Sequence, residues 1–165
     1  MTADVRTSDL EIYARGSARV DAVWAVVRDP RRLPAWTDVT AVEGLQGDRP
    51  VEEGDRFTTV ERGRRRAWRV VTHTDRLLEV DTRLPWGALG LGVRVVEDPR
   101  APRADPAHPG TRVVLAAAFL PGSAAGRMRW LAVGAPAVRR RFDRWSRAAV
   151  TDGVADAPRI LPTDG

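Results

Sequence analysis

The fold is decided by residues 123–150, which read SAAGRMRWLAVGAPAVRRRFDRWSRAAV. Apolar side chains recur there at spacings of three and four, which places them on one stripe of a helix. The stripe consists of Leu131, Ala135, Val138, Phe142, Trp145 and Ala149. Pro136 lacks a backbone N–H, so we expect a kink or a restart there, with a shorter first segment carrying Met128, Trp130 and Leu131. A helix of this length with one apolar stripe needs a partner surface.

The upstream residues predict that surface, because most of them alternate between apolar and polar with a period of two. Residues 10–15 form the first such strand, followed by a helical stripe at 20–27 and a short, proline-limited helix or turn at 31–36. Six more strands are predicted at residues 39–45, 56–62, 66–74, 77–84, 89–97 and 112–120. The sequence therefore predicts an α+β fold: a bent, antiparallel, seven-stranded sheet wrapped around the long C-terminal helix, with two short helices after the first strand.

Length and composition indicate one domain. A chain of 165 residues is long enough for a single core and too short for two. We assign the domain to residues 8–151 and expect residues 152–165, which contain Gly153, Pro158 and Pro162, to be a disordered tail. No apolar run approaches the ~18 residues that a membrane span needs, so we expect a cytoplasmic protein without integral membrane association.

The net charge of +5 raises the question of nucleic acid binding. All 27 basic residues are arginine, and they are scattered among 22 acidic residues. The two densest groups, residues 62–69 and 139–147, fit a hairpin and the outer side of a helix. We therefore predict no nucleic acid partner.

Few side chains suit catalysis. Cysteine and lysine are both absent, which excludes thiolate and Schiff-base chemistry, and no Gly-x-Ser-x-Gly elbow is present. The two histidines, His73 and His108, lie 35 positions apart without a third ligand nearby, so we predict no metal and no cofactor. His73 is a weak candidate for an acid or base, with Glu61 or Asp81 as neighbours across the sheet.

Several phrases resemble the START-like, or SRPBCC, superfamily, and within it the polyketide cyclase/dehydrase and lipid-transport family. These are Ala18–Trp24 with Asp29, Leu33 and Trp36, then Gly54–Phe57, Gly110–Arg112, and Ala135–Phe142. The resemblance covers residues 8 to 150. It implies a helix-grip fold with a hydrophobic cavity between the bent sheet and the long helix.

The cavity that this resemblance implies has candidate ligand-binding residues from strands, loops and helices. They are Trp36, Phe57, Trp68, Leu78, Val80, Trp86, Leu91, Val93, Leu115, Phe119, Trp130, Val138 and Phe142. The six tryptophans suit a flat aromatic ligand, or alternatively they fill a core. The strand around Trp68 has two readings, because Arg69, Val71 and His73 face inward if Trp68 faces outward.

Two functions of different class follow. The first is a binding protein for a hydrophobic, aromatic or polycyclic secondary metabolite or lipid-like molecule, which it transports, sequesters or holds for self-resistance. The second is a polyketide cyclase, aromatase or dehydratase. Aromatase/cyclases of this superfamily tend to carry an arginine directly after the histidine that corresponds to His73, whereas this chain has Thr74. We favour binding, by a monomer or a homodimer, because a cavity is implied and a catalytic set is not visible.

Overall fold

A single antiparallel sheet of seven strands forms the framework of the protein. The computed structural model describes residues 9–155, with side chains for residues 9–151. The strands are β1 (Leu10–Gly16), β2 (Ala41–Glu43), β3 (Arg56–Glu61), β4 (Arg64–His73), β5 (Leu77–Leu84), β6 (Gly87–Asp98) and β7 (Gly110–Pro121). Their order in the sheet is β1-β7-β6-β5-β4-β3-β2. The predicted seven-stranded antiparallel sheet is confirmed.

Alternation along the central strands gives the sheet an inner, apolar face and an outer face. On β6, Leu89, Val93 and Val95 are buried on the inner face, whereas Arg94 points outward and is exposed. The inner residues of β5 and β6 lie directly opposite each other, as Leu78 and Val93 do. The alternation of apolar and polar residues in the sequence therefore matches the alternation of inward-facing and outward-facing side chains along these strands.

Two short helices follow β1, as predicted. α1 (Val20–Val27) buries Val23, Val26 and Val27. The 3₁₀ turn η2 (Pro30–Arg32) comes next, and α2 (Leu33–Trp36) continues from it. Asp29 caps this turn, because its Oδ1 accepts the backbone N–H of Arg31 at 3.0 Å. Both helices contact the long C-terminal helix and help to enclose the inner face.

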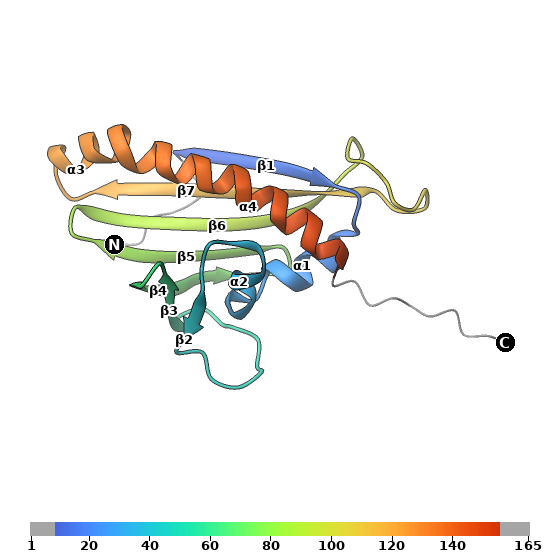
Figure 1. Cartoon of the computed structure of the whole chain (residues 1–165), viewed down its shortest axis with the longest axis horizontal. Coiled ribbons are helices and arrows are strands. Elements are labelled where there is room, and N and C mark those ends of the chain that lie inside the picture. Colours follow the sequence, from blue (N-terminus) through green and yellow to red (C-terminus); the bar gives the residue numbers. More distant parts are fainter. Residues whose placement is uncertain (1–8, 156–165) are drawn as a thin grey trace.

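The C-terminal helix has three parts: α3 (Ala124–Arg129), a π-helical turn η3 (Trp130–Gly134) and α4 (Ala135–Ala155). Figure 1 shows the helix running along the sheet, with α3 at one end of the molecule. The predicted restart at Pro136 is not present: the helix runs on without interruption, and what changes beside this proline is the helix type, from π to α at Ala135. α4 continues to Ala155, past the predicted domain end at residue 151; the rest of the predicted tail, like residue 8, lies outside the described residues.

The predicted stripe of the long helix is right for Val138, Phe142 and Trp145, which all border the space between helix and sheet. It is wrong for Leu131, which is 57% exposed, while its neighbour Trp130 is 4% exposed. The π-helical turn causes the difference, because one extra residue in a turn rotates every side chain before it relative to those after it. The turn is tight: a Cβ on Gly134 would lie 2.4 Å from the Trp130 ring.

Among residues 9–155, no helix is long and apolar enough to cross a membrane.

Candidate ligand-binding site

A cavity of about 740 Å³ lies between the inner face of the sheet and the helices. Strands β3 to β7 form its floor, α4 forms its roof, and the segment from α1 to α2 closes one side. Residues that line it are Val27, Pro30, Leu33, Trp36, Thr37, Val39, Phe57, Thr59, Glu61, Arg62, Arg64, Arg65, Arg66, Trp68, Leu78, Val80, Leu89, Leu91, Gly92, Val93, Leu115, Val138, Arg141, Phe142 and Trp145. A pocket of this size holds a drug-sized organic molecule.

Most of the predicted site residues meet in this cavity. Ten of them are in its lining: Trp36, Phe57, Trp68, Leu78, Val80, Leu91, Val93, Leu115, Val138 and Phe142. They come from seven elements spread along the sequence, and the antiparallel register brings the inner-face positions of the strands together. The walls they form are aliphatic and aromatic.

Strand β4 turns Trp68 inward. Trp68 lies opposite Phe57 of β3 and is 8% exposed, while Arg69 points outward and pairs with Asp81 at 2.7 Å. A register shift between Val70 and Thr72 marks a bulge further along the strand. Because a bulge inserts one residue, His73 returns to the inner face although it lies five positions after Trp68.

His73 nevertheless lies outside the cavity lining. Its Nδ1 is 2.6 Å from the carbonyl oxygen of Val51, and since a carbonyl can only accept, Nδ1 donates. The ring packs 6.1 Å from that of Trp24 on α1. The two carboxylates considered as its neighbours have other partners, because Glu61 binds Arg141 and Asp81 binds Arg69. The structure thus assigns His73 a contact that fastens the segment around Val51.

Three other predicted residues, Trp86, Phe119 and Trp130, pack against one another instead of lining the cavity. The Phe119 ring lies 4.8 Å from that of Trp86 and 4.9 Å from that of Trp130. A Cβ on Gly126 would come within 2.4 Å of the Trp86 carbonyl oxygen, so a glycine there lets α3 sit directly on the β5–β6 turn. This cluster fills the core at the end of the fold beneath α3. For these three aromatic residues the structure therefore has core packing in place of ligand contact.

A buried hydrogen bond places a hydroxyl in the cavity wall. Trp68 Nε1 donates to Thr59 Oγ1 at 2.9 Å, and both residues are buried. The bond holds the Trp68 ring against the wall. The Thr59 hydroxyl accepts in this bond and retains its own hydrogen as a donor.

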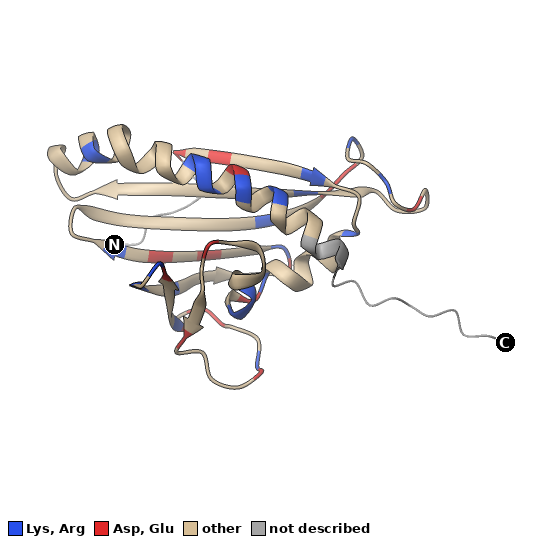
Figure 2. Ribbon diagram, viewed as in Figure 1, with Lys and Arg blue, Asp and Glu red and all other residues tan. Residues whose placement is uncertain are grey.

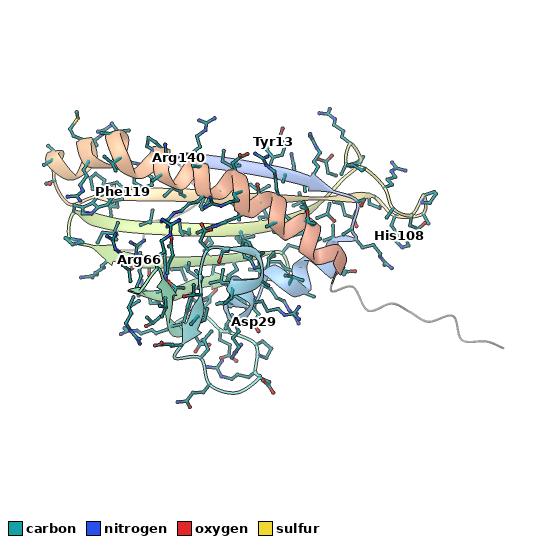
Figure 3. All side chains as sticks on the ribbon, in the orientation of Figure 1. Tyr13, Asp29, Arg66, His108, Phe119 and Arg140 are labelled. Atoms are coloured by element: carbon teal, nitrogen blue, oxygen red, sulfur yellow. The ribbon has the colours of Figure 1, made fainter. Side chains whose placement is uncertain are left out.

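Arg66 supplies a positive charge to the same part of the lining. Arg66 lies on β4, opposite Thr59 of β3, and its guanidinium carbon is 5.9 Å from the centre of the Trp68 ring. Figure 3 shows its side chain rising from the sheet toward the long helix. Burial lowers the pKa of Arg66 from its ordinary value, and the nearby charge of Arg141 lowers it further. A guanidinium still remains protonated at physiological pH.

Ion pairs connect α4 to the far edge of the sheet beside this charge. Arg141 binds Glu61 through both carboxylate oxygens at 2.9 Å. One turn further along, Trp145 Nε1 donates to Asp38 Oδ2 at 3.1 Å, and Arg144 pairs with the same carboxylate. Two connections thus hold the helix over the cavity on the side of β2 and β3.

The sequence analysis placed none of the threonine, arginine and glutamate residues in the lining, which are Thr37, Thr59, Glu61, Arg62, Arg64, Arg65, Arg66 and Arg141. The signal was present, since Phe57, Thr59 and Glu61 alternate with period two, and Arg66 shares the parity of Trp68. This pattern assigns residues to the cavity only when the inward orientation of Trp68 is known. The alternative in which Arg69 faces inward is wrong, because Arg69 pairs with Asp81 on the outer face of the sheet.

Residues 9–155 contain no cluster of three or more acidic or histidine side chains able to hold a metal ion. Besides the indole N–H groups of its tryptophans, the polar groups of the cavity lining are two threonine hydroxyls, five arginines and one carboxylate that is already paired. What they can do chemically is donate hydrogen bonds and present positive charge to an acceptor oxygen on an otherwise apolar molecule.

Comparison with solved structures gives the architecture its name. XoxI from Bacillus cereus superimposes with a TM-score of 0.65 at 12% identity, covering 88% of this chain and 94% of that protein. The Zhui aromatase/cyclase from Streptomyces sp. R1128 superimposes with a TM-score of 0.62 at 17% identity, covering 94% and 97%. The chain has the helix-grip fold. This is the fold that the resemblance in the sequence implied.

A further neighbour of this helix-grip protein is the di-domain ARO/CYC BexL from the BE-7585A biosynthetic pathway. It superimposes with a TM-score of 0.62 at 14% identity, and the match covers 88% of this chain and 46% of BexL. No family model matches the sequence, and no curated protein matches it either. At these identities the superpositions establish the fold alone.

Proposed function

We propose that this protein binds a hydrophobic, flat aromatic or polycyclic small molecule, of the kind found among secondary metabolites or lipid-like compounds, inside its cavity. The role that fits is transport, sequestration or self-resistance. One observation carries the proposal: a cavity of about 740 Å³, lined largely by aliphatic and aromatic side chains, lies between sheet and helix. Its volume falls in the range of small-molecule sites, which generally combine apolar walls with a few polar groups.

The polar groups narrow the class of ligand. Arg66 and the Thr59 hydroxyl both offer donors, and the carboxylate of Glu61 is bound by Arg141. A ligand with acceptor oxygens at one end, such as a carbonyl, a phenolate or a carboxylate, complements these donors. The remaining ring system of the ligand packs between Trp68 and Phe142, where aromatic contacts favour a flat shape.

Native mass spectrometry of the protein purified from the cells that make it tests the proposal directly. We expect a bound small molecule of a few hundred daltons that dissociates on denaturation. Val138→Trp, which fills the cavity from α4, should abolish the adduct. Arg139→Trp adds the same ring to the exposed side of the same helix and should retain it. An adduct that survives Val138→Trp contradicts binding in this cavity.

Catalysis on a polyketide-like intermediate is the second candidate, and Arg66 is the observation that favours it. Arg66 is exposed but borders the cavity, and a positive charge placed there would stabilise an enolate as it forms, which is what cyclisation of a ketide requires. Two proteins with the same fold, Zhui and BexL, are described as aromatase/cyclases. We place binding first because no base adjoins Arg66 in the cavity, where Glu61 is held by Arg141.

Conversion of a poly-β-ketone by the purified protein distinguishes the two candidates. For an enzyme, Arg66→Gln should lower turnover by about 10²-fold or more, since one electrostatic donor is worth that much. His73→Ala should leave turnover within a few-fold, because His73 lies outside the lining. A binding protein returns the ketide unchanged, and its affinity should fall in Trp68→Ala more than in His73→Ala. Turnover that depends on His73 would contradict the site assigned to the cavity.

A further inference from the structure

One end of the long helix turns apolar side chains toward solvent. Met128 is 67% exposed, Leu131 57% and Val133 63%, although each of them is large and hydrophobic. On the opposite side of the same segment, Gly126 and Trp130 are buried against the sheet. The segment therefore has apolar side chains that the fold does not use, and we call these three exposed residues, Met128, Leu131 and Val133, the outer helix tip.

Only positive charges accompany the outer helix tip. Arg127 and Arg129 are exposed on α3, and the guanidinium of Arg129 lies 5.7 Å from the ring of Trp86. The sequence contains no aspartate or glutamate from residue 106 to residue 142. Figure 2 shows the same thing in space, since the helix carries no acidic residue until α4 is well under way. A partner of this surface must accept apolar contact and positive charge together.

The shape of the tip favours a fluid partner. Its three side chains project with more than half of their surface free, and none of them lines the cavity. Such a projection enters a lipid headgroup layer without needing a matching groove. Apolar side chains flanked by arginines, with tryptophan just beneath, are also the pattern by which helices rest on anionic lipid.

We propose that the outer helix tip docks the protein peripherally on an anionic lipid surface. Met128 and Leu131 enter the boundary between headgroups and acyl chains, while Arg127 and Arg129 pair with lipid phosphates. The π-helical turn is what makes this possible, because it rotates Leu131 away from the core side that an unbroken helix would give it. The proposal concerns a surface separate from the cavity and does not depend on the identity of the cavity ligand.

Co-sedimentation with vesicles tests the proposal. The intact protein should sediment with vesicles of phosphatidylcholine containing phosphatidylglycerol and stay in solution with phosphatidylcholine alone. Met128→Ser combined with Leu131→Ser should lower partitioning about tenfold or more through lost apolar burial. Arg127→Gln combined with Arg129→Gln should lower it by about fivefold for each charge. Circular dichroism verifies that these exposed substitutions leave the fold intact.

Matched controls separate docking at the tip from general attraction of a basic protein. Tyr13→Ser removes another exposed large side chain, 51% exposed on β1, and should not change partitioning. Arg83→Gln with Arg94→Gln removes two exposed charges from the outer face of the sheet and should have less effect than the tip pair. Equal loss from both arginine pairs, or failure to bind anionic vesicles at all, overturns the proposal. The proposal is also overturned if the protein is a dimer that dissociates when Met128 and Leu131 are substituted, because the outer helix tip is then an interface between two copies.

Discussion

Arg141 on α4 forms a bidentate ion pair with Glu61 at the end of β3, in which the Nη1 and Nη2 atoms of Arg141 each lie 2.9 Å from one carboxylate oxygen. The pair spans the cavity's polar side and joins residues 80 positions apart. It also neutralises Arg141, so the positive charge that a ligand meets comes from the other arginines of the lining, Arg66 among them. Coupling between the ion pair and the ligand charge follows from this arrangement.

Glu61→Gln should therefore raise the affinity for an anionic aromatic ligand, because it frees the charge of Arg141 to act beside Arg66. Affinity for a neutral ligand of the same shape should stay within about twofold, and stability should fall by no more than about 1 kcal/mol, since the pair is partly exposed. Tryptophan fluorescence titrations with a naphthalene sulfonate and with its uncharged sulfonamide measure both affinities. An equal change for the two ligands would mean that the ion pair acts by closing the cavity and not through charge.

Phe142→Ala and Leu131→Ala test the phase of the long helix. Phe142 is 2% exposed, so its truncation should lower the free energy of unfolding by about 3 kcal/mol. Leu131 is 57% exposed, and its truncation should change that free energy by less than about 0.5 kcal/mol. Urea unfolding of the two variants gives both numbers. A large loss of unfolding free energy in Leu131→Ala would mean that Leu131 is buried on the same stripe as Phe142, which would contradict the π-helical turn.

Thr59→Val should destabilise the protein by about 1–3 kcal/mol, because it removes the acceptor of the buried Trp68 Nε1 and leaves that donor unpaired. Thr58→Val makes the same replacement on the opposite face of the same strand and should be nearly neutral. Chemical denaturation compares the pair, and the Trp68 ring should also lose its fixed position, visible as a change in near-ultraviolet circular dichroism. Equal stability of the two variants would show that the hydrogen bond contributes nothing.

Asp98 supports a prediction about pH. Its hydrogen bond from Arg15 at 2.7 Å lowers the pKa of the carboxyl from its ordinary value, and the backbone N–H of Arg100 lowers it further. A carboxyl whose pKa is lower in the folded state stabilises that state above its unfolded pKa of about 3.9, and this contribution is lost as pH falls through the folded pKa.

The stability difference between the natural protein and Asp98→Asn should accordingly be constant from neutral pH down to about 4 and should shrink below that. Thermal unfolding at several pH values measures it. Asp81→Asn, which removes the partner of the exposed Arg69, provides a comparison at a more solvated pair. A difference that grows as the pH falls would reverse the assigned sign.

Much of the architecture was contained in local pattern. Alternation along residues 77–84 and 89–97 identified the strands and the face that each one buries, and Leu89 and Val93 are buried as that pattern requires. The spacing of Val138, Phe142 and Trp145 identified the helical face toward the sheet. Pro136 marked a point beside which the helix changes from π to α geometry, although the helix does not stop there. Each of these features depends on neighbours within a few residues, and such patterns can be read from a sequence directly.

Other features depended on contacts between distant parts of the chain. Trp68 and His73 both face inward because a bulge in β4, where it pairs with β5, inserts one residue. No local sequence pattern shows where the register between two strands shifts. Trp130 is buried and Leu131 is exposed because the π-helical turn shifts the phase of the helix. Gly134 permits this turn, since a Cβ there would lie 2.4 Å from the Trp130 ring. Trp86 and Phe119 close the end beneath α3 instead of meeting a ligand, since the turn that carries Trp86 contacts α3.

The sequence by itself thus determined the elements, their order and the apolar faces that enclose a cavity, because periodicity of side chains fixes which face of each element avoids water. Only the tertiary structure decided what is polar inside that cavity. Thr59, Glu61, Arg66 and Arg141 become one group through the pairing of β3 with β4 and the crossing of α4 above them. Such a group exists only when register and helix phase are both fixed, and these are set by long-range packing.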